Sequence, residues 1–172
     1  MGSTKPAMVK VMAMEVHPAI KELAPLLGTW TGRGSGFFPT IAPFEYVEEV
    51  VFGHVGKPFI SYVQKTRNPV DGSPMHAEMG FLRVPSPGHV ELLVVQPSGI
   101  TEIDVGRLTA RDGVLDIEVA SESVGRTPTA KEVTALVRTF HLENDQLSYV
   151  VKMAGVGQPL QDHLVGTLIR QD

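Results

Sequence analysis

Residues 28–34 read Gly-Thr-Trp-Thr-Gly-Arg-Gly, a GxWxGxG pattern, and the hydrophobic periodicity changes at this stretch. Before it, Ile20, Leu23 and Leu27 recur at spacings of three and four, which predicts one short helix with a single apolar stripe. Pro18 suits the first position of that helix, where its missing N–H is not needed, and the first glycine of the motif can end it. After the motif the period becomes two. The stretch therefore predicts the point where a helix leads into the first strand of a sheet.

Short segments rich in Val, Ile, Leu and Tyr follow the motif at regular spacing. They are residues 44–52, 58–64, 76–84, 89–96, 100–109, 114–121, 130–143, 146–154 and 162–170. Turns rich in Gly, Pro, Asn and Asp separate them, so neighbours can pair as antiparallel hairpins. A sheet of this size without covering helices tends to close, because closure removes its exposed edges. The sequence therefore predicts an all-β fold, an antiparallel β-barrel of about ten strands with a short N-terminal helix closing one end.

The composition fits one domain and excludes several classes of site. The chain has 172 residues, a formal net charge of −4 and no basic cluster to neutralise phosphates, so we expect no nucleic-acid partner. It has no cysteine, which excludes disulfides, iron–sulfur clusters and thiolate zinc sites. No apolar run approaches the ~18 residues of a membrane span, so we expect no membrane partner and a cytoplasmic location. We expect residues 1–14 to be a flexible tail and residues 15–172 to be the folded domain.

The predicted barrel is wide for its contents. A barrel of about ten strands is wider than the eight-stranded type, which already accommodates a small ligand. The chain offers one Trp and an aromatic fraction of 6%, which is little material for filling such an interior. The interior therefore points to an internal guest, although composition does not identify it.

Several separated motifs follow one another in a fixed order. They are GTWTGRG with Pro39-Thr40, Phe44 and Tyr46; His54-Val55-Gly56 with Pro58; Pro74-Met75-His76 with Glu78, Gly80 and Phe81; Ala130-Lys131-Glu132; and Gln158-Pro159 with His163-Leu164. Together they span residues 17–170 and resemble the nitrobindin family. The resemblance implies a ten-stranded antiparallel barrel that holds one ferric haem b, partly exposed at the barrel mouth. It also implies binding of nitric oxide and isomerisation of peroxynitrite to nitrate.

Six histidines could in principle ligate iron. Four of them give no sign of this role, since two lie at a helix start or in a turn, and a lone strand histidine is more often a surface or core residue. These four are His17, His54, His89 and His141.

His163 lies in the last predicted strand. Period-two alternation puts it on one face with Val165, Thr167 and Ile169, and this alternation does not say which face points inward. The resemblance to nitrobindins implies that His163 gives the axial nitrogen to the haem iron, and a neutral imidazole suits that role.

The resemblance implies further contacts with the cofactor. They involve Thr40, Met75, His76, Gln96, Lys131 and Met153. We expect His76 either to donate a hydrogen bond to an iron-bound ligand or to pack on the porphyrin edge. Lys131 would pair with a haem propionate, the alternative being a solvated strand lysine. For the two methionines the alternative is plain core packing.

Other constellations in the sequence do not indicate an active site. Glu48, Glu49 and Glu118 do not indicate the carboxylate pair of a glycosidase, because nothing in the sequence brings them together. Alternating acidic residues on a strand normally lie on its solvent-facing side. The sequence has no GxSxG elbow and no HExxH zinc motif.

The expected function is that of a haem-dependent peroxynitrite isomerase whose chemistry takes place at the iron, with peroxynitrite and nitric oxide as ligands. The exposed barrel wall could support a homodimer. Two alternatives remain open. One is a lipocalin-like or fatty-acid-carrier-like barrel that binds an apolar molecule and catalyses nothing. The other is a nitric-oxide or redox sensor that signals through a partner.

Overall fold

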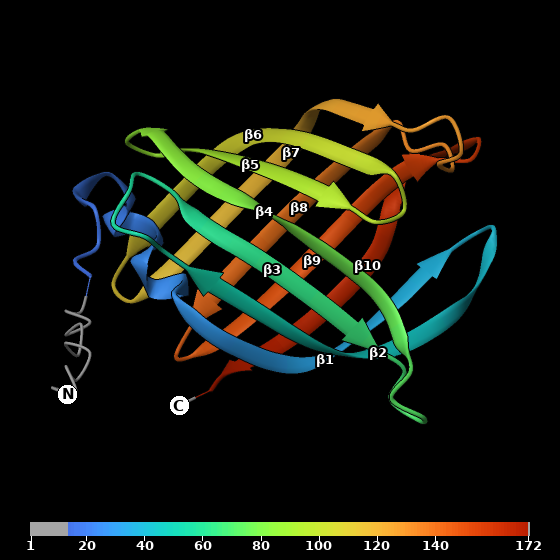
Figure 1. Cartoon of the computed structure of the whole chain (residues 1–172), viewed down its shortest axis with the longest axis horizontal. Helices are drawn as coiled ribbons and strands as arrows, with labels where there is room; N and C mark the ends of the chain where they lie inside the picture. The colour runs from blue at the N-terminus through green and yellow to red at the C-terminus, as the bar shows by residue number, and fades with distance from the viewer. Residues whose placement is uncertain (1–13, 172) are drawn as a thin grey trace, which may run out of the picture.

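The computed structural model describes residues 14–171, which form one short helix and ten strands (Figure 1). The helix is η1 (Pro18–Leu26), and the strands are β1 (Gly28–Phe38), β2 (Ile41–Gly53), β3 (Ile60–Arg67), β4 (Pro74–Ser86), β5 (His89–Gln96), β6 (Ile100–Arg111), β7 (Val114–Arg126), β8 (Ala135–Glu143), β9 (Gln146–Gly155) and β10 (Gln158–Arg170). Each strand pairs antiparallel with the next, and β1 pairs with β10 to close the barrel. The predicted all-β barrel is confirmed. The tail expected over residues 1–14 falls, apart from Met14, outside the described residues.

The helix η1 packs into one end of the barrel, but it is a 3₁₀ helix with three residues per turn. Ile20, Leu23 and Leu26 therefore share one face, and all three are buried. The sequence pattern places Leu27 in the third position; the tighter period puts Leu26 there, and Leu27 is only half-buried. The Trp30 indole Nε1 donates to the Leu26 carbonyl oxygen at 2.7 Å, which ties the helix to β1.

The glycines of the GxWxGxG stretch meet different requirements. Gly28 has a φ of +122° at the junction of η1 and β1, a left-handed value that side chains rarely adopt. Gly32 lies where β1 pairs with β10, and a Cβ there would overlap the carbonyl oxygen of Thr167. Because these two strands close the barrel, the missing side chain at Gly32 allows their backbones to meet.

The strand β8 begins later than the sequence predicts. The pattern indicates a strand over 130–143, whereas β8 starts at Ala135 and residues 131–134 have no regular structure. Residues 127–130 turn around Pro128, which has no N–H to donate to a neighbouring strand. Lys131 therefore lies on a loop and not on a strand.

The two ends of the barrel differ in content. Apolar side chains that pack on η1 fill the first end, among them Trp30, Ile60 and Leu82. The β1–β2, β3–β4, β5–β6, β7–β8 and β9–β10 connections lie at the opposite end, where the interior is hollow. Within residues 14–171, no helix is both long enough and apolar enough to cross a membrane.

Candidate functional site

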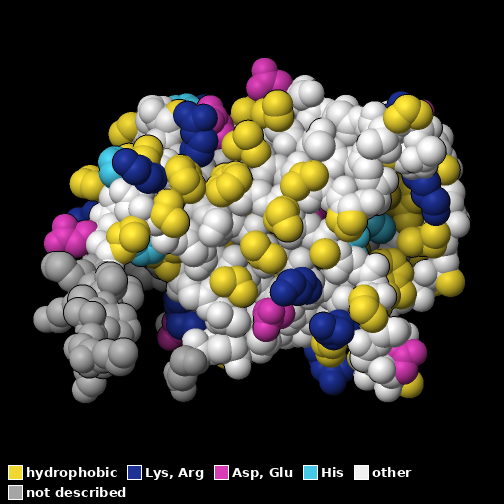
Figure 2. Space-filling model, in the orientation of Figure 1, with side chains coloured by type: hydrophobic (Ala, Val, Ile, Leu, Met, Phe, Trp, Pro, Cys, Tyr) yellow, Lys and Arg dark blue, Asp and Glu magenta, His cyan; other side chains and the backbone are white. Residues whose placement is uncertain are grey.

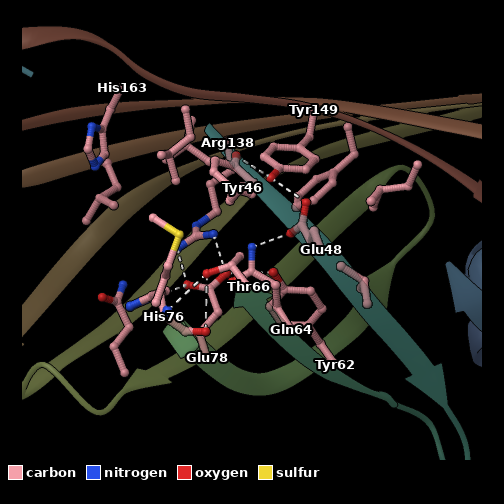
Figure 3. A pocket seen from close by; sticks show the side chains of 18 of the residues that line it. Tyr46, Glu48, Tyr62, Gln64, Thr66, His76, Glu78, Arg138, Tyr149 and His163 are labelled. Atoms are coloured by element: carbon pink, nitrogen blue, oxygen red, sulfur yellow. Dashed lines mark hydrogen bonds and ion pairs between the residues drawn. The ribbon is translucent and has the colours of Figure 1, made fainter. Parts of the chain in front are cut away.

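A cavity of about 300 Å³ occupies the hollow end of the barrel (Figure 3). Its wall is mostly apolar and includes Phe44, Val151 and Leu164, while several charged and hydroxyl-bearing side chains enter it from β2, β3, β4, β8 and β9. Five of the seven predicted site residues line this cavity. They are Met75, His76, Gln96, Met153 and His163.

A β-bulge turns His163 into the cavity. Asp162 pairs with Lys152 and Leu164 pairs with Val151, so His163 is an extra residue on β10. On the regular part of the strand beyond the bulge, Val165, which alternation groups with His163, is exposed on the outer wall. The bulge breaks that alternation, and His163 and Leu164 both line the cavity. Simple alternation would have placed His163 outside with Val165.

The backbone holds the His163 ring in one tautomer. His163 Nδ1 lies 2.9 Å from the Phe37 carbonyl oxygen, and a carbonyl can only accept, so Nδ1 carries the hydrogen. The Phe38 ring packs edge-on at 5.4 Å between centroids. Burial lowers the pKa of His163, so the ring is neutral at neutral pH. Nε2 is then left with the free lone pair, which is the requirement for an axial haem ligand.

A second bulge brings Met75 and His76 into the same cavity. Thr66 pairs with His76 and Arg67 pairs with Pro74, so Met75 is the extra residue on β4. Adjacent strand residues normally face opposite ways, but both of these line the cavity. His76 Nε2 lies 4.0 Å from a carboxylate oxygen of Glu78.

Gln96 and Met153 reach the cavity by regular alternation, whereas Thr40 and Lys131 do not line it. The Gln96 amide donates to the Glu102 carboxylate, and Met153 follows Tyr149 and Val151 on the inner face of β9. Thr40 is exposed in the β1–β2 turn, and Lys131 is exposed on the β7–β8 loop. Both lie on connections at the hollow end, so their contact with a cofactor at the rim stays a prediction.

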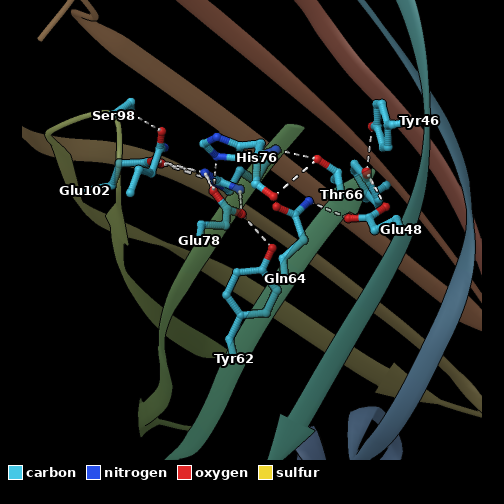
Figure 4. Close-up of polar contacts among 12 residues, drawn as sticks. Tyr46, Glu48, Tyr62, Gln64, Thr66, His76, Glu78, Ser98 and Glu102 are labelled. Atoms are coloured by element: carbon cyan, nitrogen blue, oxygen red, sulfur yellow. Dashed lines mark hydrogen bonds and ion pairs between the residues drawn. The ribbon is translucent and has the colours of Figure 1, made fainter. Parts of the chain in front are cut away.

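Sequence reasoning missed a network of charges inside the barrel (Figure 4). Arg138 of β8, which is 4% exposed, makes two hydrogen bonds to Glu78, at 2.8 and 3.1 Å, and further ones to Glu102, the shortest at 2.9 Å. Its Nε also lies 3.7 Å from Asp104. Tyr62 donates to Glu78 at 2.6 Å. One guanidinium thus faces three buried carboxylates.

A second polar group centres on Glu48, and here the sequence-based prediction is wrong. Alternation of acidic residues places Glu48 on the solvent-facing side of its strand, but in the structure it is 4% exposed and lies inside the barrel. It accepts hydrogen bonds from Gln64 and, at 2.6 Å, from the Tyr149 hydroxyl. Glu49 and Glu118 are exposed, as expected. Glu48 shares its strand parity with Phe44, Tyr46, Val50 and Phe52, and this apolar company was the available signal for an inward carboxylate.

Two of the buried acids are poised near neutrality. Burial raises the pKa of Glu48 from 4.5 to about 7. Burial, with repulsion from Glu102, raises the pKa of Asp104 from 3.8 to about 7. Neither oxygen of Asp104 accepts a hydrogen bond from a described residue, and a proton on Asp104 would let it donate to Glu102. Burial alone would also raise the pKa of Glu78, but attraction and hydrogen bonds from Arg138 outweigh it and lower that pKa.

The raised pKa of Glu48 predicts stability that falls with rising pH. The folded state binds the proton more tightly than the unfolded state, so the contribution is full below about pH 4.5 and is lost as pH rises through about 7. The loss is on the order of 3 kcal/mol. In urea unfolding, we expect the midpoint urea concentration to be higher at about pH 5.5 than at about pH 8. Glu48→Gln should reduce this pH dependence without abolishing it, because Asp104, whose pKa is also raised to about 7, acts in the same direction in both proteins.

Glu49→Gln, one residue away on the outer wall, is the matched control for that measurement and should leave the slope unchanged. His163, whose pKa is lowered, acts in the opposite direction below its unfolded pKa, so the comparison between variants isolates Glu48. An equal pH slope in Glu48→Gln and the unaltered protein would contradict the assignment.

The site suits an iron that arrives within a macrocycle. Among residues 14–171, no three His, Asp or Glu side chains converge as a site for a bare metal ion. The structure instead offers one neutral imidazole nitrogen facing an apolar cavity, with methionine, histidine and glutamine side chains around it. This donor set fits a haem, which brings four of its own nitrogens and needs one axial ligand and an apolar slot.

Comparisons with known proteins agree with that fit. Residues 19–170 match the family described as "THAP4-like, heme-binding beta-barrel domain". The chain is 59% identical over 160 residues to Peroxynitrite isomerase 2 of Mycobacterium avium (strain 104), covering 93% of this chain and 99% of that protein. It is 55% identical over 163 residues to Peroxynitrite isomerase 1 of Mycobacterium tuberculosis (strain H37Rv), with the same coverage.

A solved structure shows the same fold. The crystal structure of Rv2717c from M. tuberculosis superposes with a TM-score of 0.90 at 55% sequence identity, covering 92% of this chain and 100% of that chain. At 55% identity over nearly the whole of both chains, the two proteins share much of their sequence as well as the barrel topology.

Proposed function

Because the chain belongs to the THAP4-like, heme-binding β-barrel domain family, we propose that it isomerises peroxynitrite to nitrate with a haem b held by His163. The nitrobindin resemblance is confirmed by this membership, and haem is the family's cofactor. The observation that carries the proposal is a neutral histidine on a bulge, with its Nδ1 bound to the backbone and its ring directed into a cavity.

The residues of this chain divide the work of holding the cofactor. His163 supplies the axial nitrogen, and the Phe37 carbonyl and the Phe38 ring fix the orientation of its imidazole. Met75 and Met153 provide adaptable apolar contacts. Thr40 and Lys131 act at the rim, where Lys131 can pair with a propionate. When bound, ferric haem supplies a Lewis acid that polarises the peroxo oxygen of peroxynitrite.

His76 and Gln96 are two of the polar side chains that line the cavity, and both lie close to the hollow end of their strands. Glu78 and Glu102 lie behind them and join both to Arg138. His76 and Gln96 can therefore offer N–H groups to an anion in the cavity, while the apolar wall limits the water around it. Within this proposal no side-chain acid or base is needed, because the reaction rearranges atoms of one ion.

Nitric oxide, a small ligand for the open iron position, is included in the proposal as a second ligand. We also place the functional domain at residues 15–172 and the protein in the cytoplasm.

A homodimer through the outer wall completes the proposal. Exposed apolar side chains gather on β4, β5 and β6, where Met79 pairs with Val95 across the strands, and Phe81, Ile103 and Val105 are also exposed (Figure 2). An apolar patch of this kind supports association with a second copy.

The carrier alternative has less support. Arg138, the guanidinium inside the cavity, is already engaged by Glu78 and Glu102 and is not available to a fatty-acid carboxylate. The family match and the named relatives also favour haem chemistry over passive transport.

Adding ferric haem b to the purified protein should produce a saturable Soret band at one haem per chain. Stopped-flow mixing of the loaded protein with peroxynitrite should show accelerated decay and an increased yield of nitrate relative to nitrite. The control is free haem at the same concentration in the same buffer, without protein. A Soret band without faster peroxynitrite decay would contradict the isomerase and leave a haem-binding protein.

A further inference from the structure

All three tyrosines of the chain line the cavity at the hollow end of the barrel. They are Tyr46, Tyr62 and Tyr149, which are 2%, 3% and 7% exposed. Each hydroxyl is hydrogen-bonded to a carboxylate or to another phenol. Phenols are the side chains, besides Trp and Cys, that lose an electron most readily. The chain has no Cys, and its one Trp lies at the other end of the barrel.

Tyr46 and Tyr149 form a chain of hydroxyl groups that ends on Glu48 (Figure 3). The Tyr46 and Tyr149 oxygens are 2.7 Å apart, and Tyr149 donates to Glu48 Oε2 at 2.6 Å. Tyr46 also lies 3.3 Å from the carbonyl oxygen of Val165, two residues beyond His163. The pair therefore lies beside the strand that carries the proposed iron ligand.

Glycines in the barrel wall fix the positions of both rings. Tyr46 pairs with Gly34 across β1 and β2, and Tyr149 pairs with Gly166 across β9 and β10. A Cβ at Gly34 would overlap the Tyr46 ring, and a Cβ at Gly166 would overlap the Tyr149 ring. Gly34 and Gly166 also pair with each other. The two phenol rings thus lie side by side over Gly34 and Gly166, where any larger residue would overlap them.

The proton acceptors of the tyrosines differ. A phenol that loses an electron must also lose its proton, so it needs a base at hydrogen-bond distance. Glu48, the base beside Tyr149, has a pKa raised by burial to about 7 and takes a proton readily. Glu78, the base beside Tyr62, is engaged by Arg138, and its pKa is lowered despite burial. Tyr62 is buried to a similar degree as Tyr149 and its hydrogen bond has the same length of 2.6 Å, but its acceptor is the weaker base.

We propose that the hydrogen-bonded phenols Tyr46 and Tyr149 are a site of one-electron oxidation and nitration inside the barrel, with Glu48 receiving the phenolic proton. The inference rests on the proposed function, because peroxynitrite in the cavity is the source of the oxidant. The ligand class is nitrogen dioxide, the neutral radical formed when the O–O bond of peroxynitrous acid breaks and the fragments separate before they rejoin.

The chemistry balances with nitrogen dioxide alone. One molecule takes an electron from the phenol and becomes nitrite, and the phenolic proton passes along the hydrogen bond to Glu48. A second molecule couples to the ring carbon beside the hydroxyl, and that carbon's hydrogen then moves to the phenolic oxygen. One phenol and two nitrogen dioxide molecules give one 3-nitrotyrosine, one nitrite and one proton. The pair would capture radical that escapes from the cavity before it reaches other molecules.

The test is peptide mapping by mass spectrometry after a measured dose of peroxynitrite, on both haem-loaded and haem-free protein. We expect nitration at Tyr46 and Tyr149 together to exceed nitration at Tyr62 by roughly tenfold, because efficient transfer of the proton favours the first pair. Glu48→Gln, which removes the base and keeps the shape, should reduce that ratio to about one. Glu49→Gln, on the outer wall of the same strand, should leave it unchanged.

Single phenylalanine variants test the order of the hydrogen bonds from Tyr46 through Tyr149 to Glu48. Tyr149→Phe should remove the path from Tyr46 to Glu48 and lower nitration of Tyr46 to the level of Tyr62. Tyr46→Phe should leave nitration of Tyr149 in place. Nitration spread evenly over all three tyrosines, or a preference that survives Glu48→Gln, would overturn the inference.

The readouts separate this inference from the proposed function. A protein that accelerates peroxynitrite decay but nitrates its tyrosines evenly refutes the role of the pair and keeps the isomerase. A protein that binds no haem, or gains no rate from it, refutes the isomerase. The ratio measured in the haem-free protein still decides the role of the pair, because free peroxynitrous acid also releases nitrogen dioxide.

Discussion

His163→Ala is expected to lower the affinity for haem by at least about 100-fold, because even the loss of groups that only support a metal ligand costs 10–100-fold. His163 is the one described histidine that combines a bulge position, a lowered pKa and a backbone partner on Nδ1. Its removal leaves the apolar slot but no axial nitrogen. The measurement is titration with ferric haem, followed at the Soret band, together with the rate of peroxynitrite decay.

The control for this variant is His141→Ala. His141 is exposed on the outer wall, where its Nδ1 lies 2.6 Å from Asp116, a contact that raises its pKa. The His141→Ala variant should bind haem with the same affinity as the unaltered protein. Retention of full haem affinity in His163→Ala would show that another residue supplies the axial ligand, and His76, in the same cavity, would be the next residue to replace.

The fold and the site differ in how far the sequence predicts them. Strands with regular alternation, such as β5 over residues 89–96, follow directly from the period of two. The faces of His163 and Met75 do not, because each lies at a bulge that adds one residue to its strand. A bulge depends on the register with the neighbouring strand, which a single segment does not contain. The family resemblance, and not the alternation, identified both residues.

The buried charges are predictable only in part, because the sequence pattern contains a signal for them that other expectations outweigh. Arg138 shares its strand parity with Leu136, Phe140 and Leu142, so the pattern already holds a signal for an inward guanidinium. The expectation that charged residues lie outside outweighs that signal when each strand is considered alone. The cost of burial is offset only when Glu78 and Glu102, from two other strands, meet the same side chain. Their meeting depends on the closed barrel, and no local pattern predicts it.

Arg138→Met is expected to destabilise the protein by about 3–5 kcal/mol, because it leaves buried carboxylates without their cation. Glu78 and Glu102 are 5% and 2% exposed, so solvent cannot replace the guanidinium at little cost. Urea unfolding at neutral pH should show the loss as a lower midpoint. Arg83→Met, which removes an exposed arginine 3.5 Å from Glu91, is the matched control and should cost less than about 1 kcal/mol.

The pH dependence of the Arg138→Met variant distinguishes charge from packing. Without the guanidinium, burial dominates and raises the pKa of Glu78 above its unfolded value, so the folded variant binds an additional proton. Its stability deficit should therefore shrink as pH falls toward about 4.5. A deficit caused by lost packing would stay constant over that range. The variant Arg138→Met with Glu78→Gln and Glu102→Gln should recover most of the lost stability, because its buried amides carry no charge.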